Sequence, residues 1–226
     1  MDRFLQTLLA CAVAAGSAVS AERVLVAPET GGTAWNERRY GADGAARVSG
    51  AEVKSADETA SRPGVVLPLV PPGAGETFRS VDGLGAHAKR LNLSFHVPEA
   101  ASPKWVLKVF VRDWDYLWWQ VRIEDVVSRY GTGEIAVSVS LAGEEAAAAW
   151  EPVGHGRVWH ALTPDHAIEV GVAAEHPGDA SPPPDAPSIL LLGATVESEA
   201  PSAAAEIRDV RWWPRHPKAL EPVELR

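Results

Sequence analysis

The chain has 226 residues, of which 46% are hydrophobic, so it is long enough to bury a core. It carries 30 acidic and 21 basic side chains, and its formal net charge of −9 disfavours nucleic acid and anionic lipid as partners. The single cysteine, Cys11, has no partner within the chain, so the fold must rest on its hydrophobic core rather than on a disulfide.

Residues 1–21 have the features of a secretory signal peptide. Arg3 precedes an apolar run, and the run ends in small residues at Ser20 and Ala21. We expect cleavage after Ala21, which leaves 22–226 as one domain that is secreted or held in the periplasm or cell envelope. A membrane anchor is the competing interpretation, but the run is short for a span. No other segment is apolar enough to cross a bilayer, so we expect no membrane insertion after signal removal.

Short runs rich in β-branched and aromatic residues follow, and we predict a strand in each. These predicted strands are residues 23–27, 65–70, 90–97, 104–111, 116–123, 135–141, 167–173, 188–196 and 204–213. Pro68 marks an edge strand or a strand end. Apolar and polar residues alternate in 90–97 and in 135–141, which puts one face in the core and the other in water.

Helical signals are sparse. The alanine run in 142–150 predicts a turn or two of helix, or a loop insertion. Residues 41–60 are polar and small and predict irregular surface chain, and 176–187 contain three consecutive prolines and predict a loop. With about nine strands and no βαβ rhythm, the sequence predicts an all-β fold, a two-sheet antiparallel β-sandwich of the jelly-roll type.

Nine tryptophans are unevenly distributed along the chain, and several fall in 104–120. This segment predicts two strands joined by a tight turn at 113–116, where aspartates accept hydrogen bonds from backbone amides. In the second strand Trp118 and Trp119 point to opposite faces. We therefore expect one of the two in the core and its neighbour on the opposite surface.

An exposed tryptophan on a sheet suits sugar binding, because the apolar face of a pyranose stacks on the indole while polar groups bond the hydroxyls. The candidate platforms are Trp114 and Trp118, and the candidate polar partners are Gln120, Arg122 and Arg112. Packing is the competing explanation for each tryptophan, since these rings bury readily.

Three blocks resemble, in the same order, the galactose-binding-like jelly-roll domains of secreted bacterial polysaccharide-active proteins. The blocks are DWDYLWWQ at 113–120, WEPVGHGRVW at 150–159 and IEVGV at 168–172. Tyr116 departs from the pattern, in which a glycine is usual at that position. The resemblance implies a carbohydrate-binding-module-like jelly roll whose partner is a polysaccharide or another glycan.

The resemblance also implies a structural calcium ion. In such jelly rolls calcium often ties the N-terminal loop to the last strand through carboxylate and carbonyl oxygens. Asp209 occupies the position of the last-strand carboxylate, and Glu29 or Glu22 supplies the other end. A zinc site is disfavoured, because the seven histidines form no helical pair of the metalloprotease kind.

Catalytic motifs are absent from the sequence: it contains neither a Gly-x-Ser-x-Gly elbow nor a Walker loop. Asp113 and Asp115 are too close on one turn to flank a glycosidic bond well. The sequence therefore favours a non-catalytic carbohydrate-binding module. Two alternatives stay open: a structural or protein-interaction domain of the cell envelope with an envelope protein as partner, and a small glycan-cleaving enzyme.

Overall fold

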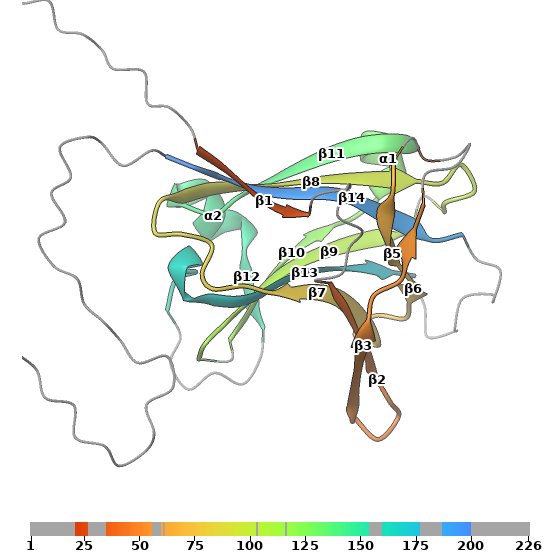
Figure 1. Cartoon of the computed structure of the whole chain (residues 1–226), viewed down its shortest axis with the longest axis horizontal. Helices are drawn as coiled ribbons and strands as arrows, with labels where there is room; N and C mark the ends of the chain where they lie inside the picture. Colours follow the sequence, from red (N-terminus) through yellow and green to blue (C-terminus); the bar gives the residue numbers. More distant parts are fainter. Residues whose placement is uncertain are drawn as a thin grey trace, which may run out of the picture.

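Two β-sheets stacked face to face dominate the structure (Figure 1). The structure is a computed structural model, and it describes residues 21–26, 35–55, 60, 62–102, 104–115, 117–153, 160–176 and 187–199. The strands are β1 (Ala21–Val26), β2 (Asn36–Tyr40), β3 (Ala46–Gly50), β4 (Val53–Lys54), β5 (Gly64–Leu67), β6 (Leu69–Val70), β7 (Gly75–Ser80), β8 (Ala88–Val97), β9 (Val106–Asp113), β10 (Trp118–Ile123), β11 (Gly133–Ser140), β12 (Glu151–Val153), β13 (Ala167–Glu175) and β14 (Ile189–Ser198). The helical elements are α1 (Val126–Tyr130), α2 (Gly143–Ala149) and the 3-10 turn η2 (Pro164–His166).

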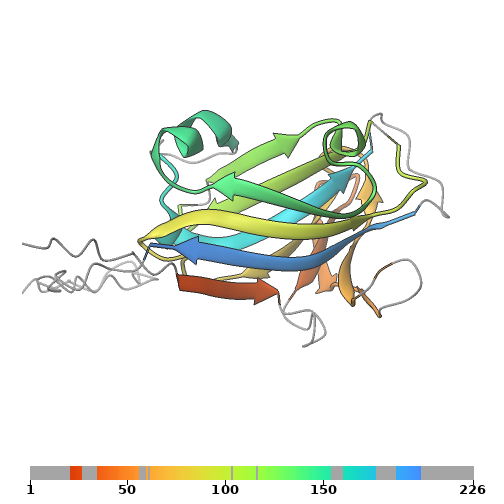
Figure 2. The same ribbon diagram turned by 90° about the horizontal axis from the view of Figure 1, so that it is seen from above.

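The first sheet has the strand order β11-β8-β14-β5-β4, with β1 also paired to β14. Viewed from above, β11, β8, β14 and β1 lie side by side (Figure 2). The second sheet has the order β12-β10-β9-β13-β7-β2-β3, with β6 paired to β13. Within the described chain every strand pair is antiparallel except β6 with β13. The chain crosses repeatedly between the sheets, which confirms the predicted jelly-roll sandwich.

The hydrophobic core lies between the two sheets and follows from the alternation along the strands. The inward side chains of β8 are at most 3% exposed, and they are Leu91, Leu93, Phe95 and Val97. The second sheet contributes to the same core cluster through Leu107, Val109, Val111, Trp119, Val170 and Val172. One face of each sheet is therefore used for packing, as the period-two pattern predicts.

Most predicted strands are confirmed where the structure describes them. Pro68 separates β5 from β6, as expected for a residue that donates no backbone hydrogen bond. The predicted turn or two of helix in 142–150 is present as α2. The predicted strand 204–213 and most of the predicted loop 176–187 lie outside the described residues.

The prediction that 41–60 is irregular is wrong in part, because this segment contains β3 and β4. Every residue of β3 is exposed, so the strand has no buried face and leaves no apolar alternation in the sequence. It is held by β2, with which it forms a hairpin at the edge of the second sheet (Figure 1).

The expected signal peptide lies outside the described residues except for Ala21, where β1 begins. The cleavage site and the export of the chain therefore remain predictions. In the part of the chain that the structure describes, no helix has the length and apolarity needed to cross a membrane.

Candidate functional site

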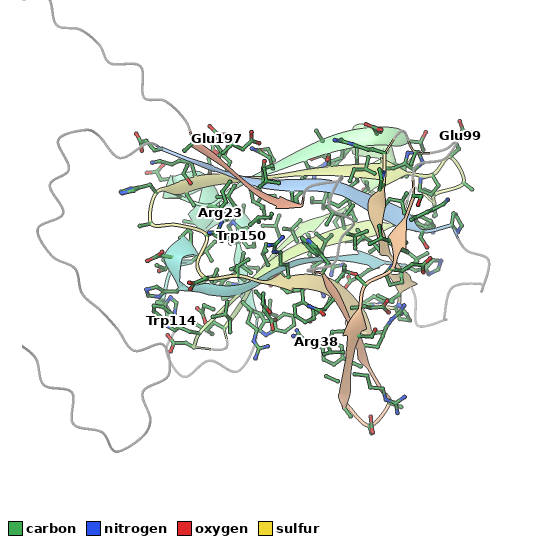
Figure 3. The ribbon with its side chains drawn as sticks, in the orientation of Figure 1. Arg23, Arg38, Glu99, Trp114, Trp150 and Glu197 are labelled. Atoms are coloured by element: carbon green, nitrogen blue, oxygen red, sulfur yellow. The ribbon has the colours of Figure 1, made fainter. Side chains whose placement is uncertain are left out.

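The second sheet turns one face to the core and the other away from the first sheet, and we call the latter the outer face. In β9 the inward residues join the core cluster, while Lys108, Phe110 and Arg112 alternate with them and point outward. Arg38, from β2, lies on the side of this sheet that faces away from the first sheet (Figure 3). Residues from distant parts of the sequence therefore meet on one surface.

An aromatic stack lies at the centre of the outer face. The ring of Trp118 lies over that of Phe110, with centroids 5.1 Å apart and an interplanar angle of 18°. Phe110 is fully buried, whereas Trp118 keeps part of its surface exposed. Trp118 therefore forms the upper layer of a flat, two-ring stack.

Gly171 on β13 makes room for the lower ring. It pairs in register with Phe110, and a Cβ atom at this position would lie 2.4 Å from Phe110 Cζ. That distance is far shorter than any carbon–carbon contact, so a larger residue would force the phenyl ring to move. The glycine thus allows Phe110 to lie flat across the sheet and support Trp118.

An ion cluster borders the aromatic stack. Arg38 donates to Glu76 Oε1 at 2.6 Å and to Glu169 Oε1 at 2.8 Å, and its Cζ lies 4.1 Å from the centre of the Phe78 ring. Tyr40 donates its hydroxyl to Glu76 Oε1 at 3.0 Å. Arg38, Glu76 and Glu169 are at most 9% exposed, so these charges compensate one another with little help from water.

The buried cluster shifts the pKa of two acidic groups. Burial raises the pKa of Glu76, and the lowering effect of Arg38 offsets this only in part. Burial also raises the pKa of Tyr40 to about 12, and the negative charge of Glu76 acts in the same direction. The tyrosine therefore stays protonated and continues to donate its hydrogen bond across the neutral pH range.

A second ion cluster is centred on Glu175 of β13, which is 1% exposed. Its carboxylate lies 3.1 Å from Lys108 Nζ and 2.8 Å from Arg122 Nη1, and it accepts a hydrogen bond from the Gly73 backbone N–H. Burial would raise the pKa of Glu175, but Lys108, Gly73 and Arg122 together lower it below its usual value. The carboxylate is therefore ionised and tightly held.

Two carboxylates, Glu76 and Glu169, meet on the outer face, and this resembles the pair that a glycoside hydrolase needs. Both contact the same Arg38 Nη1, at 2.6 Å and 3.1 Å. The guanidinium thus occupies the space between them, where a glycosidic bond would have to lie. This arrangement compensates buried charge and offers no free acid and base.

Four of the five predicted ligand-binding residues lie together on the outer face. Trp118, Gln120 and Arg122 alternate along β10, and Arg112 is the cross-strand partner of Trp118. Gln120 donates to Glu151 on β12 at 3.4 Å. The structure therefore brings these four residues together from two adjacent strands.

Trp114, the fifth predicted residue, lies in the turn between β9 and β10 and is 38% exposed. One face of its ring stacks on His166, with centroids 3.8 Å apart. No described contact joins it to Trp118. It is a separate exposed aromatic group at the end of the sheet.

The predicted turn aspartate is confirmed at Asp113, which is 1% exposed. Its Oδ1 accepts hydrogen bonds from the backbone N–H groups of Asp115 and Leu117, at 2.9 Å and 3.0 Å. His160 Nε2 lies 3.2 Å from the other oxygen and is not aligned for a hydrogen bond. Asp113 therefore holds the turn.

The predicted calcium ligands Asp209 and Glu29 lie outside the described residues. Glu22, the alternative ligand, is exposed on β1 and stands opposite Glu197 of β14. Among the residues that the structure describes, no group of three or more histidine, cysteine, aspartate or glutamate side chains is placed to hold a metal. The calcium ion remains a prediction.

Sequence reasoning missed Arg38, Glu76, Glu169, Glu175 and Gly171. One sequence signal was available in β13. Glu169 and Gly171 are two positions apart, so a charged side chain and a residue without a side chain share one face of the strand. The partner of Glu169, Arg38, is 131 positions away in the chain. Only the strand order brings them together.

A hollow of about 820 Å³ lies on the first sheet. The residues around it include Glu52, His96, Glu99, Thr132, Pro187 and Leu190. Among the described residues of its lining there is no phenylalanine, tyrosine or tryptophan to provide the flat ring that sugar stacking requires. The outer face of the second sheet is therefore the stronger candidate site.

Comparison of the sequence with protein-family models and with curated proteins gives no match. Among solved structures, the chain is similar to a xylan-binding module, CBM15, with 10% sequence identity and a TM-score of 0.45. The alignment covers 82% of this chain and all of that module. The fold assignment rests on the observed sheets, and the galactose-binding-like family remains a prediction.

Proposed function

We propose that this chain is an exported, non-catalytic carbohydrate-binding module that stacks a glycan on Trp118. The observation that carries the proposal is the Trp118–Phe110 stack on the outer face. Because the buried Phe110 ring packs against one face of the indole, Trp118 is positioned without needing a ligand to order it. A rigid apolar platform of this kind loses little conformational entropy on binding a pyranose.

Polar and charged groups lie next to the platform, and sugar hydroxyls need such groups as hydrogen-bond partners. The guanidinium carbons of Arg38 and Arg112 both lie 5.9 Å from the centre of the Trp118 ring. Gln120 and Arg122 follow along the same strand as the indole. Orientation would come from these groups, while the ring supplies contact area.

The affinity for one sugar residue should be weak, because a single ring on an open sheet buries little ligand surface. Trp114 offers a second aromatic surface at the end of the same sheet, 38% exposed. A glycan chain long enough to reach both rings would bind more tightly than a monosaccharide, because the two contacts act together.

Affinity electrophoresis against a panel of soluble polysaccharides tests the proposal. The wild-type chain should be retarded by at least one polymer, and Trp118→Ala should remove most of the retardation. Tyr130→Ala serves as the control, because Tyr130 is an aromatic residue 40% exposed on α1, beside the first sheet (Figure 1).

Two results would contradict the proposal. If Trp118→Ala and Trp114→Ala both leave binding intact, the site assignment fails. If the wild-type chain binds no polymer of the panel, the carbohydrate-binding function fails, and the protein-interaction alternative becomes the better account.

A further inference from the structure

The cations of the outer face are already paired with carboxylates of the same face. Arg38 contacts Glu76 and Glu169, and Lys108 contacts Glu175 at 3.1 Å. All five of these residues are at most 9% exposed. A ligand carboxylate would have to displace a protein carboxylate from its cation. It would also have to lose its own hydration, a cost that the buried protein carboxylate has already met on folding.

The two more exposed cations are paired as well. Arg122 contacts Glu175 at 2.8 Å and Glu124 at 3.0 Å, and Arg112 lies 3.4 Å from Glu169. The side chain of Arg122 is 35% exposed, so it can reach a ligand while its charge stays compensated. Such a guanidinium can still donate N–H groups to hydroxyl oxygens.

Among the residues that the structure describes, the balance of charge on the outer face is slightly negative. Its described cations are Arg38, Lys108, Arg112 and Arg122, and the carboxylates at or beside them are Glu76, Glu124, Glu151, Glu169 and Glu175. The whole chain carries a formal charge of −9, which adds to the same field. A polyanion is therefore repelled at long range as well as at contact.

We infer that the outer face selects an uncharged polysaccharide and rejects polymers of uronic acids. This inference rests on the proposed function and names its ligand class. Hydroxyl groups both donate and accept hydrogen bonds, so they can pair with exposed carboxylates such as Glu151 as well as with Arg122. A ligand carboxylate only accepts, and it meets acceptors that are also negatively charged.

Calorimetry with two sets of defined oligosaccharides tests the inference. The neutral set is cellohexaose, xylohexaose and laminarihexaose, and the acidic set is hexagalacturonate and hexamannuronate. We expect binding to a neutral hexamer that is unchanged by added NaCl, and no measurable binding to either uronate. Tighter binding to a uronate that weakens with salt would overturn the inference while leaving the proposed function intact. Binding of neither set would overturn both.

A pair of variants locates the effect on the outer face. Glu124→Gln removes the exposed partner of Arg122, so binding of hexagalacturonate, undetectable with the wild-type chain, should become measurable at low salt. Glu99→Gln makes the same change of net charge at an exposed residue beside the hollow on the first sheet and should have no effect. Equal gains from the two variants would overturn the assignment of selectivity to this face.

Discussion

The indole ring of Trp118 lies over the ring of Phe110 at a centroid distance of 5.1 Å and an interplanar angle of 18°. Neither residue belongs to the core between the sheets, so the stack does not fill the interior of the sandwich. It lies on the outer face, where the fold leaves one side of the sheet uncovered by the other sheet. A buried ring beneath a partly exposed one gives this surface a fixed and flat apolar centre.

The Trp118–Phe110 stack depends on the space that Gly171 leaves by having no side chain. Gly171→Ala should push the Phe110 ring from its place, and the new Cβ atom would also lie 2.5 Å from the Thr77 carbonyl oxygen. Overpacking of this kind costs about 1–3 kcal/mol of stability. The tilt of Trp118 that follows should also weaken glycan binding. Urea unfolding and affinity electrophoresis measure the two effects.

Gly50→Ala is the matched control, because a Cβ atom at this position on the exposed strand β3 meets no atom within 4 Å. It should change neither stability nor binding. If Gly171→Ala behaves like Gly50→Ala, Phe110 does not need the gap and the stack is not supported as we describe.

The turn before β10 depends on Asp113, whose carboxylate accepts two backbone hydrogen bonds while 1% exposed. Asp113→Ala should cost about 3 kcal/mol, since each hydrogen bond to a charged group contributes about 1.5 kcal/mol or more. Asp115→Ala should cost about 0.5 kcal/mol or less, because the Asp115 side chain is 52% exposed. Equal losses in chemical denaturation would show that Asp113 has no special role in the turn.

Glu175 makes stability depend on pH. Its pKa is lowered in the folded protein, so its contribution is present above the ordinary value of 4.5 and is lost as the pH falls through the folded pKa. Glu175→Gln should therefore cost about 3 kcal/mol at neutral pH, where it leaves Lys108 buried without its anion. The difference from wild type should shrink in acid.

Urea unfolding at a series of pH values measures this difference, and exposed Glu99→Gln provides a reference with a small and flat difference. A Glu175→Gln difference that stays constant from neutral pH into acid would mean that the carboxylate is not stabilised by its cations in the folded state.

The predicted calcium ion can be tested by thermal melting. A chelator should lower the melting temperature of the wild-type chain, because an ion bound only to the folded state stabilises it. Excess calcium should restore the melting temperature, and Asp209→Asn should abolish both responses. An unchanged midpoint in the chelator would rule out a stabilising calcium ion.

The strands with one buried face could be predicted from the sequence. In β8 the alternation of Leu91, Leu93 and Phe95 with polar residues marks both the strand and its inward face. The strand β3 could not be found in this way, because all of its residues are exposed. Its pairing with β2 is a tertiary feature that local patterning does not encode.

For the candidate site, the sequence predicts how residues are placed relative to one another only when they lie on the same strand. Trp118 and Trp119 are adjacent, so period-two alternation placed them on opposite faces, and the structure confirms this with Trp119 at 5% exposure. The pairing of Arg38 with Glu169 joins residues 131 positions apart. It requires the order β13-β7-β2, which no local pattern reveals.

The central claim is that a glycan stacks on Trp118, and indole N–H resonances in a two-dimensional 1H–15N spectrum test it directly. Trp118→Phe assigns the Trp118 signal by its absence. On titration with a polysaccharide fragment that binds, that signal should shift strongly, while those of the buried core residues Trp119 and Trp150 should move little. Binding that leaves the Trp118 signal in place would contradict the account.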